Sequence, residues 1–176
     1  MIPIFIGIFY FTDDTISLHH KHLISSLLFA FAAITDWLDG YLARSLNQIS
    51  AFGAFLDPVA DKLMVAAALI VLVNLTYVGT LVAFIIIGRE IAISALREWM
   101  AQLGSSKSIA VSMLGKIKTS FQMLAILLLL YHEPLLGFPT HEVGTMLIYI
   151  AAILTLWSMV YYLMLAMPQI MKKTQE

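Results

Sequence analysis

Four aspartates occupy a short stretch of the chain in two pairs. Asp36 and Asp39 are three residues apart, and Asp57 and Asp61 are four apart. On a helix, either spacing puts both carboxylates of a pair on one face. Carboxylates held this close repel one another, and cations offset that repulsion. The nearest basic residues, Arg44 and Lys62, leave the cluster negative.

A hard divalent metal suits this cluster, because hard cations prefer oxygen ligands and carboxylates can bridge them. Two such ions would balance four carboxylates, and a two-metal site is a known clamp for phosphoryl displacement. Two other interpretations stay open. The acids could be solvated at helix ends, or they could form the proton relay of a transporter. Two facing pairs beside small residues favour the metal site.

The composition places these acids in a membrane protein. Of 176 residues, 61% are hydrophobic and 12% are charged, and the mean hydropathy is +0.91. Soluble domains carry roughly a quarter charged residues. The net charge is −1. These values exclude a disordered chain, an ordinary cytosolic domain and a basic nucleic-acid-binding surface. The absence of cysteine excludes disulfide and thiolate chemistry.

The expected fold class is an all-α integral membrane protein with six transmembrane helices in one domain over residues 1–176. Backbone polar groups in lipid need internal hydrogen bonds, so the apolar segments are helices. A helix needs about 20 residues to span a membrane. The first segment is shorter than that, so we expect it to be truncated. The six segments are Met1–Phe11, Leu23–Arg44, Ala54–Leu75, Thr80–Leu103, Ser112–Tyr131 and Val143–Met167.

Charge and histidine positions predict an orientation. The basic residues that lie in or beside the second and fourth loops and the C-terminus are Arg44, Lys107, Lys116, Lys118, Lys172 and Lys173. The positive-inside rule then puts that side, and the aspartates with it, in the cytoplasm. The histidines lie in the first and fifth loops on the other side: His19, His20, His22, His132 and His141. We interpret them as solvated loop residues.

The aspartates belong to a longer motif. It has the form D-x2-D-G-x2-A-R-x8-G-x3-D-x3-D and is matched at Asp36, Asp39, Gly40, Ala43, Arg44, Gly53, Asp57 and Asp61. With this motif the chain resembles the CDP-alcohol phosphatidyltransferases. Further similarity lies at Asp57–Lys62, Arg89–Ile91, Ala95–Trp99 and Gly115–Thr119. These segments look most like the bacterial branch that uses sn-glycerol 3-phosphate as acceptor.

The resemblance implies a fold, a reaction and roles for the residues. The fold would be that of the CDP-alcohol phosphotransferases, and CDP-diacylglycerol with sn-glycerol 3-phosphate would give phosphatidylglycerol phosphate and CMP. The metal would be Mg²⁺ or Mn²⁺, with two ions expected. Its ligands would be Asp36, Asp39, Asp57 and Asp61, with Asp61 also acting as the base. The CDP group would lie against Asp36, Gly40, Ala43, Arg44 and Gly53.

The acceptor brings a phosphate, so a basic subsite is expected beside the acids. Arg89, Arg97, Lys116 and Lys118 are the candidates. Arginine is the better bidentate clamp for phosphate and lysine acts as a point charge. The alternative for each cation is snorkelling to the membrane surface. Glu90, seven residues before Arg97, is placed to pair with it.

The resemblance further implies a multi-pass homodimer among the lipids of the bacterial inner membrane, with its site facing the cytoplasm. One departure is the missing P-N-x-L-T-x-x-R stretch, which usually precedes the first long helix. We therefore expect that translation starts late, that the start was misassigned or that the chain is trimmed at its start. Three alternatives stay open: a sibling enzyme with another acceptor, a non-enzymatic ion or proton carrier, and an inactive relative that only binds CDP-lipid.

Overall fold

The computed structural model describes residues 2–10, 16–45, 51–102, 113–135 and 137–174. Every regular element in these ranges is an α-helix. The helices are α1 (Ile2–Tyr10), α2 (Leu18–Ser45), α3 (Ala51–Asn74), α4 (Thr80–Gln102), α5 (Met113–Tyr131) and α6 (Thr140–Thr174). The six predicted helical segments are confirmed as helices.

Three helix starts differ from the prediction by three residues or more, and that of α6 is Thr140 rather than Val143. α2 begins at Leu18 rather than Leu23, so three histidines assigned to a loop lie on its first turns. α3 begins at Ala51 rather than Ala54, so Pro58 lies inside the helix. Proline lacks the N–H that would bond to the carbonyl four residues back. The apolar residues before it continue the helix in spite of that loss.

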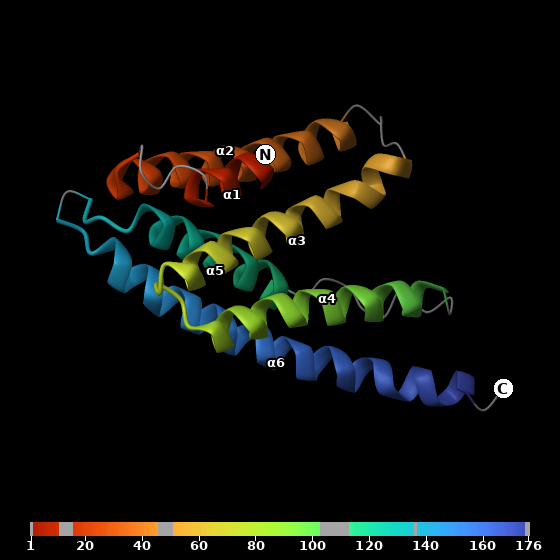
Figure 1. Cartoon of the computed structure of the whole chain (residues 1–176). Coiled ribbons are helices and arrows are strands. Elements are labelled where there is room, and N and C mark those ends of the chain that lie inside the picture. Colours follow the sequence, from red (N-terminus) through yellow and green to blue (C-terminus); the bar gives the residue numbers. More distant parts are fainter. Residues whose placement is uncertain (1, 11–15, 46–50, 103–112, 136, 175–176) are drawn as a thin grey trace.

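The helices form an elongated bundle in which the short α1 lies beside α2 and α3 (Figure 1). α5 packs most extensively against α6 and also contacts α2 and α3. The last turns of α2, α4 and α6 and the first turn of α3 lie at one end of the bundle (Figure 1). The α3–α4 turn and the α5–α6 connection lie at the other. The aspartate motif therefore sits at the first of these ends.

The interior and the surface of the bundle are both apolar. The core residues that are completely buried include Phe5, Ala68, Leu69, Leu72, Ile86, Leu129 and Leu130. Outward-facing Phe84, Trp157 and Met164 are about 70% exposed, at 73%, 68% and 69%. Large exposed apolar patches on this scale mark contact with a membrane or a partner.

Two helical stretches of the described chain are long and apolar enough to cross a membrane, Leu18–Asp39 and Thr140–Met164. Both have the roughly 20 residues that a span requires. They support a membrane protein, as the composition indicates. The expectation of six spans stays a prediction.

The histidines at the far end of the bundle form a cluster, so the interpretation as solvated loop residues is wrong for three of them. The His132 ring stacks on Tyr77 with 3.8 Å between centroids, and His141 lies edge-on to His132 at 4.5 Å. Tyr77 Oη is 3.2 Å from Nε2 of the buried His22. Burial, and then the neighbouring His141, lower the pKa of His132.

Candidate active site

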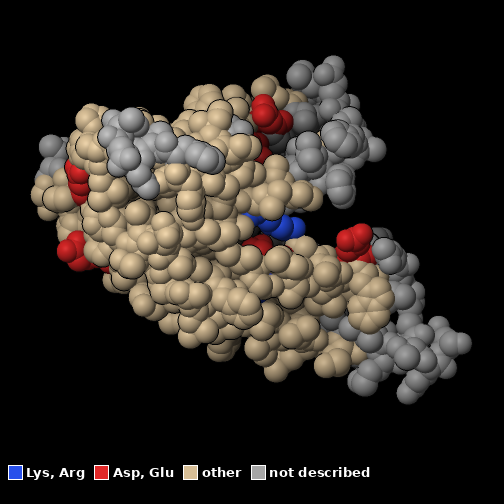
Figure 2. All heavy atoms as spheres, viewed as in Figure 1, with Lys and Arg blue, Asp and Glu red and all other residues tan. Residues whose placement is uncertain are grey.

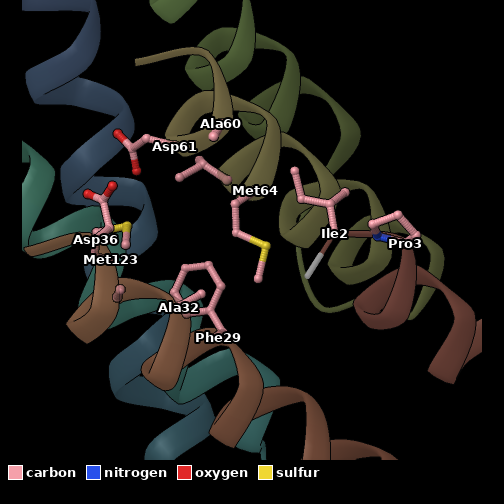
Figure 3. Close-up of a pocket in the computed structure, with 11 residues that line it drawn as sticks. Ile2, Pro3, Phe29, Ala32, Asp36, Ala60, Asp61, Met64 and Met123 are labelled. Atoms are coloured by element: carbon pink, nitrogen blue, oxygen red, sulfur yellow. The ribbon is translucent and has the colours of Figure 1, made fainter. Parts of the chain in front are cut away.

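A cavity of about 300 Å³ opens between α1, α2, α3 and α5. Two of the motif's aspartates line it, Asp36 from α2 and Asp61 from α3, and their carboxylates lie on the same side of it (Figure 3). The remaining lining is apolar: Ile2, Pro3, Phe29, Ala32, Ala33, Ala60, Met64, Val65 and Met123. A polar rim over an apolar chamber suits a ligand with a charged head and a hydrocarbon body.

The sequence explains this shape. Ala32 and Ala33 precede Asp36 by about one turn, and Ala60 adjoins Asp61. Their small side chains leave room between α2 and α3 beside the carboxylates. Phe29 and Met64, which are 1% and 8% exposed, close the chamber from the core side. The helix periodicity thus places acids at the rim and apolar groups below them.

The charges of the site are coupled. The charge of Asp61 interacts with those of Asp36, Glu90 and Lys62, which lie on three helices. In Figure 2, Lys and Arg atoms are visible in a recess bordered by Asp and Glu atoms. An anionic diphosphate would need cations here to approach the carboxylates.

The donor set is suited to a hard divalent ion. Asp36 and Asp61 offer carboxylate oxygens on one side of the cavity (Figure 3), and neither cysteine nor histidine lines it. Oxygen donors of this kind are those that Mg²⁺ and Mn²⁺ prefer. Among the described side chains, no group of three or more acidic or histidine residues is close enough to hold a metal. A metal site here needs the further carboxylates that the motif predicts.

The structure places the other motif residues on the same two helices. Asp39 is exposed on the next turn of α2 and does not line this cavity. Gly53 is half-buried in the first turn of α3. The rest fall outside the described side chains, although their backbones lie in α2 and α3: Gly40, Ala43, Arg44 and Asp57.

Two of the four predicted acceptor cations are buried in a polar network. Arg89 of α4 is 7% exposed and Lys118 of α5 is 1% exposed. Lys118 Nζ donates to Glu90 Oε1, and Arg89 Nη1 donates to the same oxygen at 3.2 Å. The snorkelling alternative is therefore wrong for Arg89 and Lys118. The side chains of Arg97 and Lys116 lie outside the described residues.

The network also includes residues of α6 that the sequence did not indicate. Arg89 Nη2 donates to Ser158 Oγ at 3.0 Å, and the guanidinium lies 5.6 Å from the centre of the Tyr162 ring. Glu90 pairs with Arg89 and Lys118, where the sequence had suggested Arg97. The apolar residues around Ser158 and Tyr162 gave no signal for either contact.

Comparison with known proteins gives the class to which this fold and site belong. Residues 1–157 match the family model described as CDP-alcohol phosphatidyltransferase. The chain belongs to this family. Curated relatives named CDP-diacylglycerol–glycerol-3-phosphate 3-phosphatidyltransferase are similar along nearly the whole chain.

Three of these relatives illustrate the similarity. The Haemophilus influenzae protein is 48% identical over 99% of this chain and 91% of its own length. The Salmonella paratyphi A protein is 49% identical over 93% of this chain and 86% of its own length. The Pectobacterium atrosepticum protein is 47% identical, with the same coverage of 93% and 86%.

Proposed function

We propose that the chain transfers the phosphatidyl group of CDP-diacylglycerol to sn-glycerol 3-phosphate, which yields phosphatidylglycerol phosphate and CMP. The observation that carries the proposal is the cavity that Asp36 and Asp61 share above an apolar chamber. Relatives at 47–49% identity carry the corresponding name. A soluble headgroup and a lipid substrate meet naturally at such a boundary.

In this proposal one of the acceptor's two free hydroxyls loses its proton to the Asp61 carboxylate. The hydroxyl oxygen attacks the lipid-side phosphorus of the diphosphate, and the bond from that phosphorus to the bridging oxygen breaks. CMP leaves with the bridging oxygen. A carboxylate that acts as a base needs only hydrogen-bond reach to the hydroxyl. Asp61 on the cavity rim offers that position.

The metal ligands would be Asp36, Asp39, Asp57 and Asp61, and Mg²⁺ or Mn²⁺, as two ions, would neutralise the diphosphate when bound. Asp36 would also adjoin the CDP group, with the close approach to the helices that a small-residue surface allows. The other residues assigned to CDP are Gly40, Ala43, Arg44 and Gly53.

The acceptor phosphate would lie on the cationic side of the site. Arg89 and Lys118 support this because both are buried cations that are tied to Glu90, whose charge reaches Asp61. Arg97 and Lys116 remain further candidates from the same two helices. The proposal places the protein in the bacterial inner membrane as a multi-pass homodimer, with the site facing the cytoplasm.

The test is turnover by the purified protein in detergent. CDP-diacylglycerol and labelled sn-glycerol 3-phosphate are supplied with Mg²⁺, with Mn²⁺ or with EDTA, and lipid-phase label and CMP are both measured. We expect metal-dependent product that Asp61→Asn abolishes and Glu142→Gln leaves unchanged. Glu142 is a matched control because it lies in the first turn of α6, at the other end of the bundle.

Each contrary result has a defined meaning. CMP release only with another alcohol would keep the family reaction and overturn the acceptor. Flux of protons or metal ions through vesicles without CMP release would favour a carrier. Full activity of Asp61→Asn would overturn the assignment of the base.

A further inference from the structure

Glu90 lies between the two described cations that are assigned to the acceptor phosphate. One oxygen, Oε1, accepts from Lys118 Nζ and from Arg89 Nη1, the latter at 3.2 Å. Glu90 itself is 25% exposed, against 1% for Lys118 and 7% for Arg89. The carboxylate therefore bridges α4 and α5 from the more open side of the network.

The cations need such a partner. A lysine carries its charge on a flexible four-carbon stem, and a buried ammonium without a counter-charge is strongly disfavoured. Glu90 supplies that counter-charge to Lys118 and limits the positions of its ammonium. Glu90 and Ser158 each accept a hydrogen bond from one of the two terminal nitrogens of Arg89. These two bonds fix the orientation of the guanidinium plane.

The network still has capacity for an anion. Two cations and one carboxylate leave one net positive charge. Arg89 Nε is buried and has no hydrogen-bond partner among the described residues, and an ammonium has three donors in all. A buried unsatisfied donor on a fixed guanidinium is a position that a phosphate oxygen can satisfy.

We propose that Glu90 is a positioning residue for the acceptor subsite: its carboxylate holds Lys118 and Arg89 in the arrangement that receives the phosphate of the acceptor. Glu90 does not touch the acceptor, since like charge excludes it from the phosphate. The inference rests on the proposed function and adds a residue that the aspartate motif does not contain. It also explains why an acid stands beside a site that binds an anion.

The test separates positioning from simple helix bracing by its kinetic pattern. Glu90→Gln keeps the size of the side chain and removes its charge. We expect the KM for sn-glycerol 3-phosphate to rise roughly 10-fold, the value of one charge-assisted hydrogen bond. The KM for CDP-diacylglycerol should change less than about 2-fold. The control Glu142→Gln should leave both constants unchanged.

A double-mutant cycle then asks whether Glu90 acts through Lys118. Lys118→Met alone should raise the KM for sn-glycerol 3-phosphate. Glu90→Gln added to Lys118→Met should give no comparable second rise, because its main partner is already gone. Independent effects that multiply would overturn the proposal, as would equal changes in both KM values.

A second variant keeps the proposal testable if Glu90→Gln does not fold. Glu90→Asp retains the charge and shortens the reach, so the KM for the acceptor should rise by a smaller factor and the KM for CDP-diacylglycerol should stay constant. Wild-type KM values in Glu90→Asp and unchanged thermal unfolding would overturn positioning. Failure of the wild-type protein to use sn-glycerol 3-phosphate would instead refute the proposed function, so the two failures are distinguishable.

Discussion

Gly144 allows the closest part of the α5–α6 packing to be tested by a single methyl group. A Cβ at this position would lie 2.9 Å from Leu129 Cγ and 3.2 Å from Leu128 Cβ. Neither atom is the free end of a side chain, and Leu129 is completely buried. Gly144→Ala therefore forces the helices apart or moves Leu129 from its rotamer. Overpacking of this kind costs about 1–3 kcal/mol.

Gly88→Ala is the matched control. Gly88 also lies inside a helix, α4, but a Cβ there meets nothing within 4 Å. Alanine is favoured over glycine in a helix by roughly 1 kcal/mol, and both variants gain this term. The difference between them isolates the contact, so Gly144→Ala should be less stable than Gly88→Ala by about 1–3 kcal/mol.

The assay is unfolding of both variants in the same detergent, followed by circular dichroism against temperature and denaturant. A Gly144→Ala protein as stable as Gly88→Ala would refute the close approach of α5 and α6 at this point. It would mean that the space between α5 and α6 at this point is large enough to hold an additional methyl group.

Three further outcomes are expected. The folded state lowers the pKa of His132 from 6.5, so the unfolded chain binds more protons in acid than the folded chain does. The free energy of unfolding should therefore be highest above about pH 6.5 and fall as the pH drops below it. Unfolding temperatures at about pH 8 and about pH 5.5 check this, and His132→Gln should reduce the difference. Ser158→Ala removes the acceptor 3.0 Å from Arg89 Nη2 and should raise the KM for sn-glycerol 3-phosphate several-fold, measured against the KM for CDP-diacylglycerol; equal changes in both would contradict it. Chelation by EDTA should stop CMP release and added Mg²⁺ should restore it, whereas release that continues in excess EDTA would refute metal dependence.

The helices and the aspartate part of the site were predictable from the sequence. Long apolar segments in a chain with 12% charged residues leave few alternatives to helices in a membrane. The spacing of Asp36 and Asp61 within the motif predicted that carboxylates from two consecutive helices would meet, and both line one cavity. Short connections between neighbouring helices make such local meetings easy to foresee.

Contacts between distant segments could not be predicted in the same way. Glu90 and Lys118 are 28 residues apart, and Arg89 and Ser158 are 69 apart. Their pairing depends on how three helices rotate about their axes, which no local spacing records. The same holds for His22, Tyr77 and His132, whose cluster joins three parts of the chain. Tertiary packing brought these residues into ring contact and buried His22.

The length of α6 bears on how deep the site lies in a membrane. Its 35 residues measure about 52 Å at 1.5 Å per residue, while the hydrocarbon core of a bilayer is about 30 Å thick. Ordinary tilts of up to about 40° do not absorb the difference. At least one end of α6 therefore extends out of the hydrocarbon. At the aspartate end of the bundle, the last turns of α2 and α4 lie beside that of α6 (Figure 1). If the extension lies there, the rim of the cavity stands at the height of the lipid headgroups, so a diphosphate could reach the carboxylates while its acyl chains stay in the bilayer.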